Sequence, residues 1–286
     1  MRQQLFLLLF LFLPHVTFCA TAAGGRCEHR CGGGFVAPYP FGFSGDCPIL
    51  LGCNATASTP LLPRSTAAAP YPVLSFNSAS STFVVSLALS CNRTVREASA
   101  SLRGARYDVS SRTTLFLRGG CRAPSPSNCS VVLPATFTSV NLSTAQCGSG
   151  VANWTCVASA RPAAGSDEAA RGQGQFLNWT AVNESRCEDA LTATVYRGEQ
   201  GEGVPSLELA VAELGWWLDG ACANATGGGE CAHNATCQDV VTPSGAPGHR
   251  CACLVDGMSG DGFAAGEGCH DQDGAGEFLL PWPLLV

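Results

Sequence analysis

The chain of 286 residues contains no lysine, so all sixteen of its basic residues are arginines. Two explanations fit this absence. A guanidinium presents a planar fork of donors that matches a carboxylate, which an ammonium does not. Alternatively, a GC-rich coding sequence favours arginine over lysine and also raises the alanine and glycine content, as seen here. Codon composition explains the missing lysine but not the clustering of the arginines described below.

The chain also lacks the short motifs of common enzyme families. It has no G-x-S-x-G, no H-E-x-x-H and no phosphate-binding loop. Carboxylates are abundant in the second half, but nothing in the sequence places two of them together, as a glycosidase would require. We therefore expect a protein that is not an enzyme and that holds no cofactor and no metal.

Apolar runs long enough to cross a bilayer as a helix, about 20 residues, are absent. The nine apolar residues 5–13 follow a short basic segment and precede an A-x-A sequence at 20–22, which is typical of a secretory signal peptide over residues 1–22. The alternative is an uncleaved membrane anchor, but nine apolar residues are too few to span a bilayer as a helix. The apolar segment 278–286 is equally short and contains two prolines. We expect a secreted chain with no membrane span.

Cysteine usage agrees with an extracellular location. Cleavage after Ala22 would remove Cys19 and leave sixteen cysteines, an even number that can all pair in an oxidising compartment. The chain also carries nine N-x-S/T sequons, which we expect on exposed segments of a glycoprotein. They are Asn54, Asn92, Asn128, Asn141, Asn153, Asn178, Asn183, Asn224 and Asn234.

Charge divides the sequence into two halves. Residues 24–161 contain eleven arginines and four acids, a net charge of +7, whereas residues 162–286 contain four arginines and eighteen acids, a net charge of −14. Seven arginines fall between residues 93 and 122. This segregation predicts two different surfaces, one basic and one acidic.

Short alternating patterns predict a mainly β chain. Residues 82–90 alternate with period two, which indicates a strand with one face toward a core. Shorter strands are predicted at 114–118, 130–133, 191–196 and 207–211, and residues 160–175 read as a surface loop. The pair Trp216 and Trp217 admits two interpretations, a platform for sugar rings or packing at a junction.

Four cysteines lie close together near the start of the expected mature chain. Cys27, Cys31, Cys47 and Cys53 surround the sequence Tyr-Pro-Phe-Gly at residues 39–42, and prolines and glycines exclude a long helix there. This stretch resembles the galacturonan-binding domain of plant wall-associated receptor kinases. Residues 138–220 resemble the cysteine-rich region that follows it in that family.

Six further cysteines have the spacing of an epidermal-growth-factor-like module. The gaps between them are 8, 5, 13, 1 and 15 residues, and six cysteines allow fifteen pairings. A zinc site would require C-x2-C pairs or histidines at ligand spacing, which are absent. The family resemblance implies the pairs Cys222–Cys237, Cys231–Cys251 and Cys253–Cys269.

The resemblance thus implies a disulfide-rich, secreted multi-domain chain of small, mainly β modules. We expect a signal peptide at 1–22, a galacturonan-binding-like domain at 24–137, a cysteine-rich domain at 138–220, an EGF-like module at 222–269 and a tail at 270–286. The family architecture continues with a membrane helix and a kinase, neither of which this sequence contains.

The resemblance also implies an acidic cell-wall polysaccharide, pectin, as the partner, in the cell wall or apoplast. Arginines would pair with its carboxylates and two aromatic rings would stack on its sugars. The expected ligand contacts are Tyr39, Phe41, Arg93, Arg96, Arg103, Arg106, Arg112, Arg118 and Arg122.

Two alternatives compete with this interpretation. The aromatic rings can belong to the core and the arginines can be scattered over a solvated surface. The chain can also be a soluble interaction protein or decoy, whose EGF-like module and acidic half bind a membrane receptor or peptide. No nucleic acid is expected as a partner in either case.

Overall fold

The computed structural model describes residues 27–64, 69–122, 147, 154–158, 175–197, 206–223, 230–253 and 258–271. Its strands are β1 (Arg30–Cys31), β2 (Phe35–Val36), β3 (Phe41–Gly42), β4 (Ile49–Leu50), β5 (Gly52–Asn54), β6 (Thr59–Leu62), β7 (Tyr71–Asn77), β8 (Thr82–Ser86), β9 (Tyr107–Val109), β10 (Thr113–Arg118), β11 (Trp154–Val157), β12 (Asp189–Arg197), β13 (Ser206–Leu209), β14 (Val211–Trp216), β15 (Leu218–Asp219), β16 (Ala235–Val241), β17 (Pro247–Cys253), β18 (Met258–Ser259) and β19 (His270–Asp271). The helices are α1 (Val95–Leu102) and α4 (Trp179–Glu184). The expected mainly β fold is confirmed.

Several predictions concern residues outside the described ranges. These are the signal peptide at 1–22, the strand at 130–133, almost all of the loop at 160–175, most of the tail, and the sequons at Asn128, Asn141, Asn153 and Asn224. Among the helices of the described ranges, none is both long and apolar enough to span a membrane.

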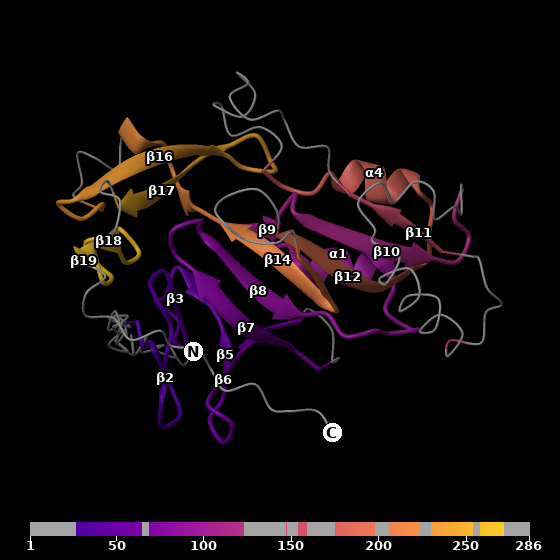
Figure 1. Ribbon diagram of the computed structural model, residues 1–286, viewed down its shortest axis with the longest axis horizontal. Helices are drawn as coiled ribbons and strands as arrows, with labels where there is room; N and C mark the ends of the chain where they lie inside the picture. The colour runs from indigo at the N-terminus through magenta and orange to yellow at the C-terminus, as the bar shows by residue number, and fades with distance from the viewer. Residues whose placement is uncertain are drawn as a thin grey trace, which may run out of the picture.

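A six-stranded sheet forms the centre of the molecule, with strand order β5-β6-β7-β8-β14-β9 (Figure 1). β14 comes late in the sequence but pairs antiparallel with β8 on one side and with β9 on the other. Residues 82–86 of the predicted strand therefore occupy an internal position in the sheet. Val84 packs on one face with Val195 and Val211, while Phe83 and Val85 enter the main core on the other. Both faces are buried, although the alternation predicted only one.

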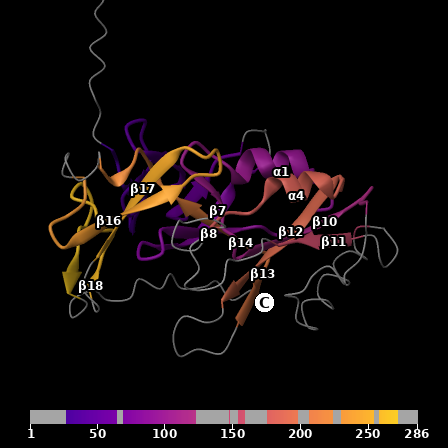
Figure 2. The same cartoon turned by 90° about the horizontal axis from the view of Figure 1, so that it is seen from above.

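A second sheet has the order β11-β10-β12-β13. β10 pairs antiparallel with β12, so residues 113–118 lie beside residues 189–195. Leu115 and Leu117 join the main core with Ala98 of α1 and Val182 of α4, and Figure 2 shows both helices on the same side of this sheet. Phe116 points to the other face, where it packs against Trp154.

Both large sheets combine strands from the two segments expected to be separate domains. β14 and β12 belong to residues 138–220, whereas β8, β9 and β10 belong to residues 24–137. The border at 137 therefore does not separate two sheets or two cores. The described strands of the two segments share both sheets and one main core.

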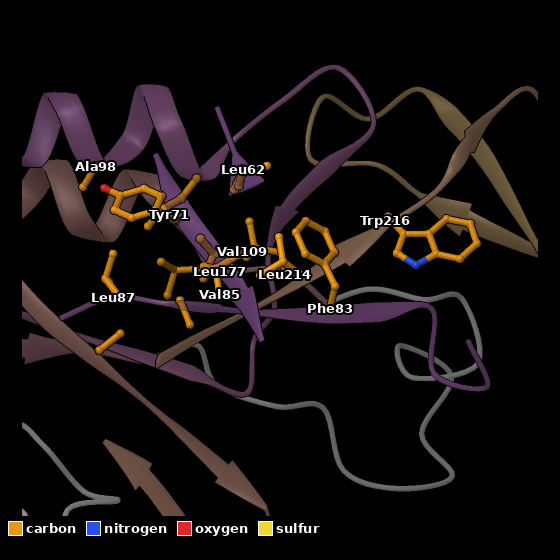
Figure 3. Packing of buried hydrophobic residues seen from close by; sticks show 14 of the residues in the cluster. Leu62, Tyr71, Phe83, Val85, Leu87, Ala98, Val109, Leu177, Leu214 and Trp216 are labelled. Atoms are coloured by element: carbon orange, nitrogen blue, oxygen red, sulfur yellow. The ribbon is translucent and has the colours of Figure 1, made fainter. Parts of the chain in front are cut away.

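The main core is aromatic at its centre. Phe41 is 1% exposed and makes edge contacts with Phe76, Phe83 and Trp216, at centroid distances of 4.8, 5.1 and 5.9 Å. Figure 3 shows Phe83 and Trp216 beside the aliphatic part of the same cluster. Such contacts add to the free energy gained from burial. The Tyr-Pro-Phe-Gly sequence is thus a core element of the fold.

The C-terminal segment attaches to this core through Phe263. Its ring is 1% exposed and lies 5.1 Å from the ring of Tyr39 and 5.8 Å from that of Trp216. The segment itself contains the three-stranded sheet β15-β17-β16 and the pair β18-β19. Tyr39 is half-buried, and Phe263 packs against its ring.

Disulfides fix both ends of the described chain. The first four cysteines pair as Cys27–Cys47 and Cys31–Cys53. Two further bridges, Cys91–Cys147 and Cys121–Cys187, connect distant parts of the sequence. The last three bridges are Cys222–Cys237, Cys231–Cys251 and Cys253–Cys269, the pairs that the resemblance implies. Such a density of bridges fits an oxidising, extracellular compartment.

Candidate ligand-binding pocket

Several arginines of residues 24–161 form ion pairs with carboxylates. Most of these carboxylates belong to residues 162–286. Arg106 lies 2.8 Å from Asp219, Arg112 lies 2.9 Å from Glu213, and Arg118 lies 3.2 Å from Asp189. Each pair joins residues at least 71 positions apart. The charges of the predicted basic and acidic surfaces therefore partly neutralise each other through ion pairs between distant segments.

Two of the expected ligand contacts are buried. Phe41 occupies the aromatic core described above. Arg93 is 5% exposed, and its guanidinium donates to the carbonyl oxygens of Ala88, Ala190 and Leu191. Neither side chain can reach a polymer on the surface. These two residues belong to the core, and the expectation that they contact ligand is corrected.

The remaining expected contacts differ in their accessibility. Arg96, on α1, and Arg122 are exposed. Tyr39 is half-buried against Phe263, where burial raises the pKa of its phenol. Trp216 and Trp217 are 1% and 5% exposed, which confirms packing as their role.

One of the predicted arginines, Arg103, lines a pocket of about 420 Å³. We call it the Arg103 pocket, and it is formed by Arg103, residues 175–180, Asn183 and residues 241–243. Three separate parts of the chain meet here: the end of α1, the start of α4 and the turn after β16. The pocket therefore lies where the C-terminal segment meets the larger sheets.

The position of Arg103 is set by α1. This helix begins with a capping box, in which Thr94 accepts a hydrogen bond from the Glu97 amide at 3.1 Å and Glu97 accepts one from the Thr94 amide at 2.9 Å. Arg103 is the C-cap residue and has an extended backbone. The sequence Thr94-x-x-Glu97 would have predicted this helix, which our reading of strands overlooked.

Asp108 anchors the guanidinium of Arg103. Its carboxylate is 2% exposed and accepts hydrogen bonds from Arg103 Nε at 3.0 Å, from Trp179 Nε1 at 2.7 Å and from the Val109 amide at 2.7 Å. Burial nevertheless dominates and raises the pKa of Asp108 above its ordinary value, while these three donors act in the opposite direction.

The anchored guanidinium keeps donors for a ligand. Arg103 uses Nε for Asp108, and its side chain is 44% exposed. Within the described ranges, its two terminal nitrogens have no hydrogen-bond partner. The group also lies 5.7 Å from the ring of Trp179, within the range of a cation–π contact. Arg103 thus presents two terminal nitrogens, both hydrogen-bond donors, in the wall of the pocket, and Asp108 holds its position.

Aromatic and amide side chains supply the other walls. Phe176 is half-buried and packs edge-on against Trp217 at 5.1 Å, with Arg250 over its ring at 5.9 Å. The side-chain oxygen of Gln175 is buried and has no hydrogen-bond partner among the described residues. The guanidinium of Arg103 can contact a carboxylate, and Phe176 can contact a sugar ring.

Sequence reasoning identified Arg103 but missed the rest of the pocket. Gln175, Phe176 and Trp179 carry no motif, because an isolated aromatic or amide residue is equally at home in a core. Asn178 and Asn183 were noted only as sequons. Their convergence depends on hydrogen bonds between distant segments, such as that from the Leu177 amide to the Val109 carbonyl at 2.8 Å.

Comparison with known proteins supports the resemblance. The chain is 30% identical over 237 residues to wall-associated receptor kinase-like 14 of Arabidopsis thaliana, a match that covers 83% of this chain and 30% of that protein. It is 26% identical over 263 residues to wall-associated receptor kinase-like 21 of the same plant, covering 92% and 37% respectively.

The chain spans about a third of the length of these curated relatives. No family model and no solved structure matches it. Over most of its own length, the chain is homologous to wall-associated receptor kinase-like proteins of plants.

Proposed function

We propose that this chain is a non-enzymatic extracellular binding module for an acidic cell-wall polysaccharide, de-esterified pectin, and that it binds through the Arg103 pocket. The observation that carries the proposal is Arg103 itself. Its guanidinium is held from behind by buried Asp108 and offers two terminal nitrogens in a pocket with Phe176 and Gln175.

The chemistry of the ligand matches this arrangement. Each uronic acid unit carries a carboxylate, which a guanidinium binds through two parallel hydrogen bonds. An aromatic side chain such as Phe176 can contact the apolar side of the sugar ring. The names of the two Arabidopsis relatives refer to the wall, which is where this polymer occurs.

The pocket predicts weak binding by a single module. Asp108 offsets part of the positive charge of Arg103, and partly exposed ion pairs contribute only about 0.2–1 kcal/mol. Affinity should fall as salt screens the pair. Several pockets bound along one polymer would raise the apparent affinity through avidity.

The test is a comparison of two polymers that differ in charge. The secreted, glycosylated protein is titrated with polygalacturonate and with fully methyl-esterified pectin, each at low and at high salt. We expect binding to polygalacturonate at low salt that weakens at high salt, and little binding to the neutral polymer. Equal binding to both polymers would contradict recognition of the carboxylate. Absence of binding to either polymer, by the glycosylated protein and by protein freed of its N-glycans, would contradict the proposed function and favour the protein-partner alternative.

A further inference from the structure

Two of the sequons lie in the wall of the Arg103 pocket. Asn178 and Asn183 both line it and both are exposed. They begin the sequences Asn178-Trp179-Thr180 and Asn183-Glu184-Ser185. We propose that oligosaccharides on these two asparagines cover the pocket, so that the occupancy of the two sequons sets the access of ligands to Arg103. This inference rests on the proposed function for the identity of the ligand.

The two asparagines lie at opposite ends of α4, and both are exposed. Asn178 is its N-cap residue, and its Oδ1 accepts hydrogen bonds from the amides of Thr180 at 2.9 Å and Ala181 at 3.4 Å. A glycan is attached to Nδ2, so the cap and the glycan use different atoms. Asn183 lies in the last turn of the helix, about 7.5 Å further along its axis.

The modification needs only a lipid-linked oligosaccharide pyrophosphate as donor. Nδ2 of the asparagine attacks C1 of the first sugar of this donor. The N–C1 bond forms, the bond from C1 to the pyrophosphate oxygen breaks, and the amide loses one proton. The product is a neutral, bulky and hydrated chain that starts at the pocket wall.

Other described sequons supply a natural comparison. Asn54, Asn92 and Asn234 are also exposed, but none of them lines the pocket. Asn234 lies just before β16, whereas the pocket uses residues at the opposite end of that strand, about 20 Å away at the usual rise per residue. Glycans at these three positions should leave Arg103 accessible.

Occupancy can be measured on one peptide. Cleavage after Arg171 and Arg186 releases residues 172–186, which contain both sequons. Enzymatic release of the glycans converts each occupied asparagine to aspartate, so the peptide mass counts the occupied sites. If both sequons are empty in the secreted protein, the inference fails.

Access is then measured with a glycan-deficient variant. Thr180→Ala removes the first sequon but keeps the Asn178 cap, and Asn183→Gln removes the second. Asn92→Gln and Asn234→Gln, which each remove a sequon outside the pocket, are the matched controls. The readout is the rate at which an arginine-selective dicarbonyl modifies Arg103, followed by peptide mass spectrometry, together with the Kd for polygalacturonate.

We expect the variant with both pocket sequons removed to show severalfold faster modification of Arg103 and severalfold tighter binding, and both controls to behave as the wild type. An unchanged rate of Arg103 modification would overturn the inference. If modification accelerates but neither protein binds polygalacturonate, the coverage of Arg103 stands and only the proposed function fails.

Discussion

The indole nitrogen of Trp179 lies 2.7 Å from Oδ1 of Asp108, although 71 positions separate the two residues in the sequence. Through this contact the start of α4 is fixed to β9, and Asp108 holds Arg103 with its second oxygen. The candidate pocket therefore depends on one buried carboxylate that organises residues from three segments.

The first prediction concerns Asp108 and pH. Burial raises its pKa above the ordinary value of 3.8, so the folded protein binds this proton more tightly than the unfolded chain does. The contribution of Asp108 to the free energy of unfolding therefore falls as pH rises from 3.8 through the folded-state pKa. Relative to the wild type, Asp108→Asn should gain stability as pH rises across this window.

The measurement is urea unfolding of both proteins at several pH values. At each pH, the free energy of unfolding of the wild type is subtracted from that of the variant. This subtraction cancels the contribution of all other carboxylates, which the two proteins share. A difference that stays constant with pH, or one that moves in the opposite direction, would contradict a raised pKa at Asp108.

A second prediction concerns the helix that positions Arg103. Thr94→Ala removes the acceptor for the Glu97 amide and should lower the free energy of unfolding by about 1 kcal/mol. Thr94→Ser keeps the acceptor and should be close to neutral. Because Thr94 also completes the Asn92 sequon, denaturant unfolding of the two variants freed of N-glycans checks this, and equal stabilities would show that the cap does not stabilise α1.

The third prediction concerns the attachment of the C-terminal segment. Because Phe263 is buried between Tyr39 and Trp216, Phe263→Ala should destabilise the whole chain by about 3–5 kcal/mol. Val241→Ala, at a 44% exposed side chain, is the control and should have little effect. Calorimetry of the disulfide-intact proteins should show a single unfolding transition, and its midpoint temperature should be lower in Phe263→Ala than in the wild type. Two transitions, of which only the smaller moves, would show that the segment folds independently.

The sequence was most informative where spacing carries the signal. The alternation at 82–90 placed β8, and the cysteine spacing, read through the family resemblance, gave three bridges that the structure contains. The same alternation could not show that the second face is buried, because Val84 meets Val195 and Val211 only through the second sheet.

Net charge along the sequence was less informative. The seven arginines between 93 and 122 looked like one basic surface, but three of them pair with carboxylates far away in the sequence. Arg106 and Asp219 are 113 positions apart, and their ion pair exists only because the fold brings β15 next to that loop. Sequence alone therefore could not distinguish Arg103, which lines the pocket, from Arg93, which is buried.

The measurement that tests the central claim most directly is the effect of single arginine substitutions on polygalacturonate binding at low salt. Arg103→Gln and Arg96→Gln each remove one positive charge, from the pocket and from the exposed face of α1 respectively. The double variant Arg103→Gln with Asp108→Asn leaves no unpaired buried charge, so loss of binding can be separated from loss of folding.

Binding through the pocket predicts that both Arg103 variants lose roughly fivefold in affinity, about 1 kcal/mol, while Arg96→Gln binds as the wild type. Equal losses for Arg103→Gln and Arg96→Gln would mean that the polymer responds to overall charge, and would contradict a role for the pocket.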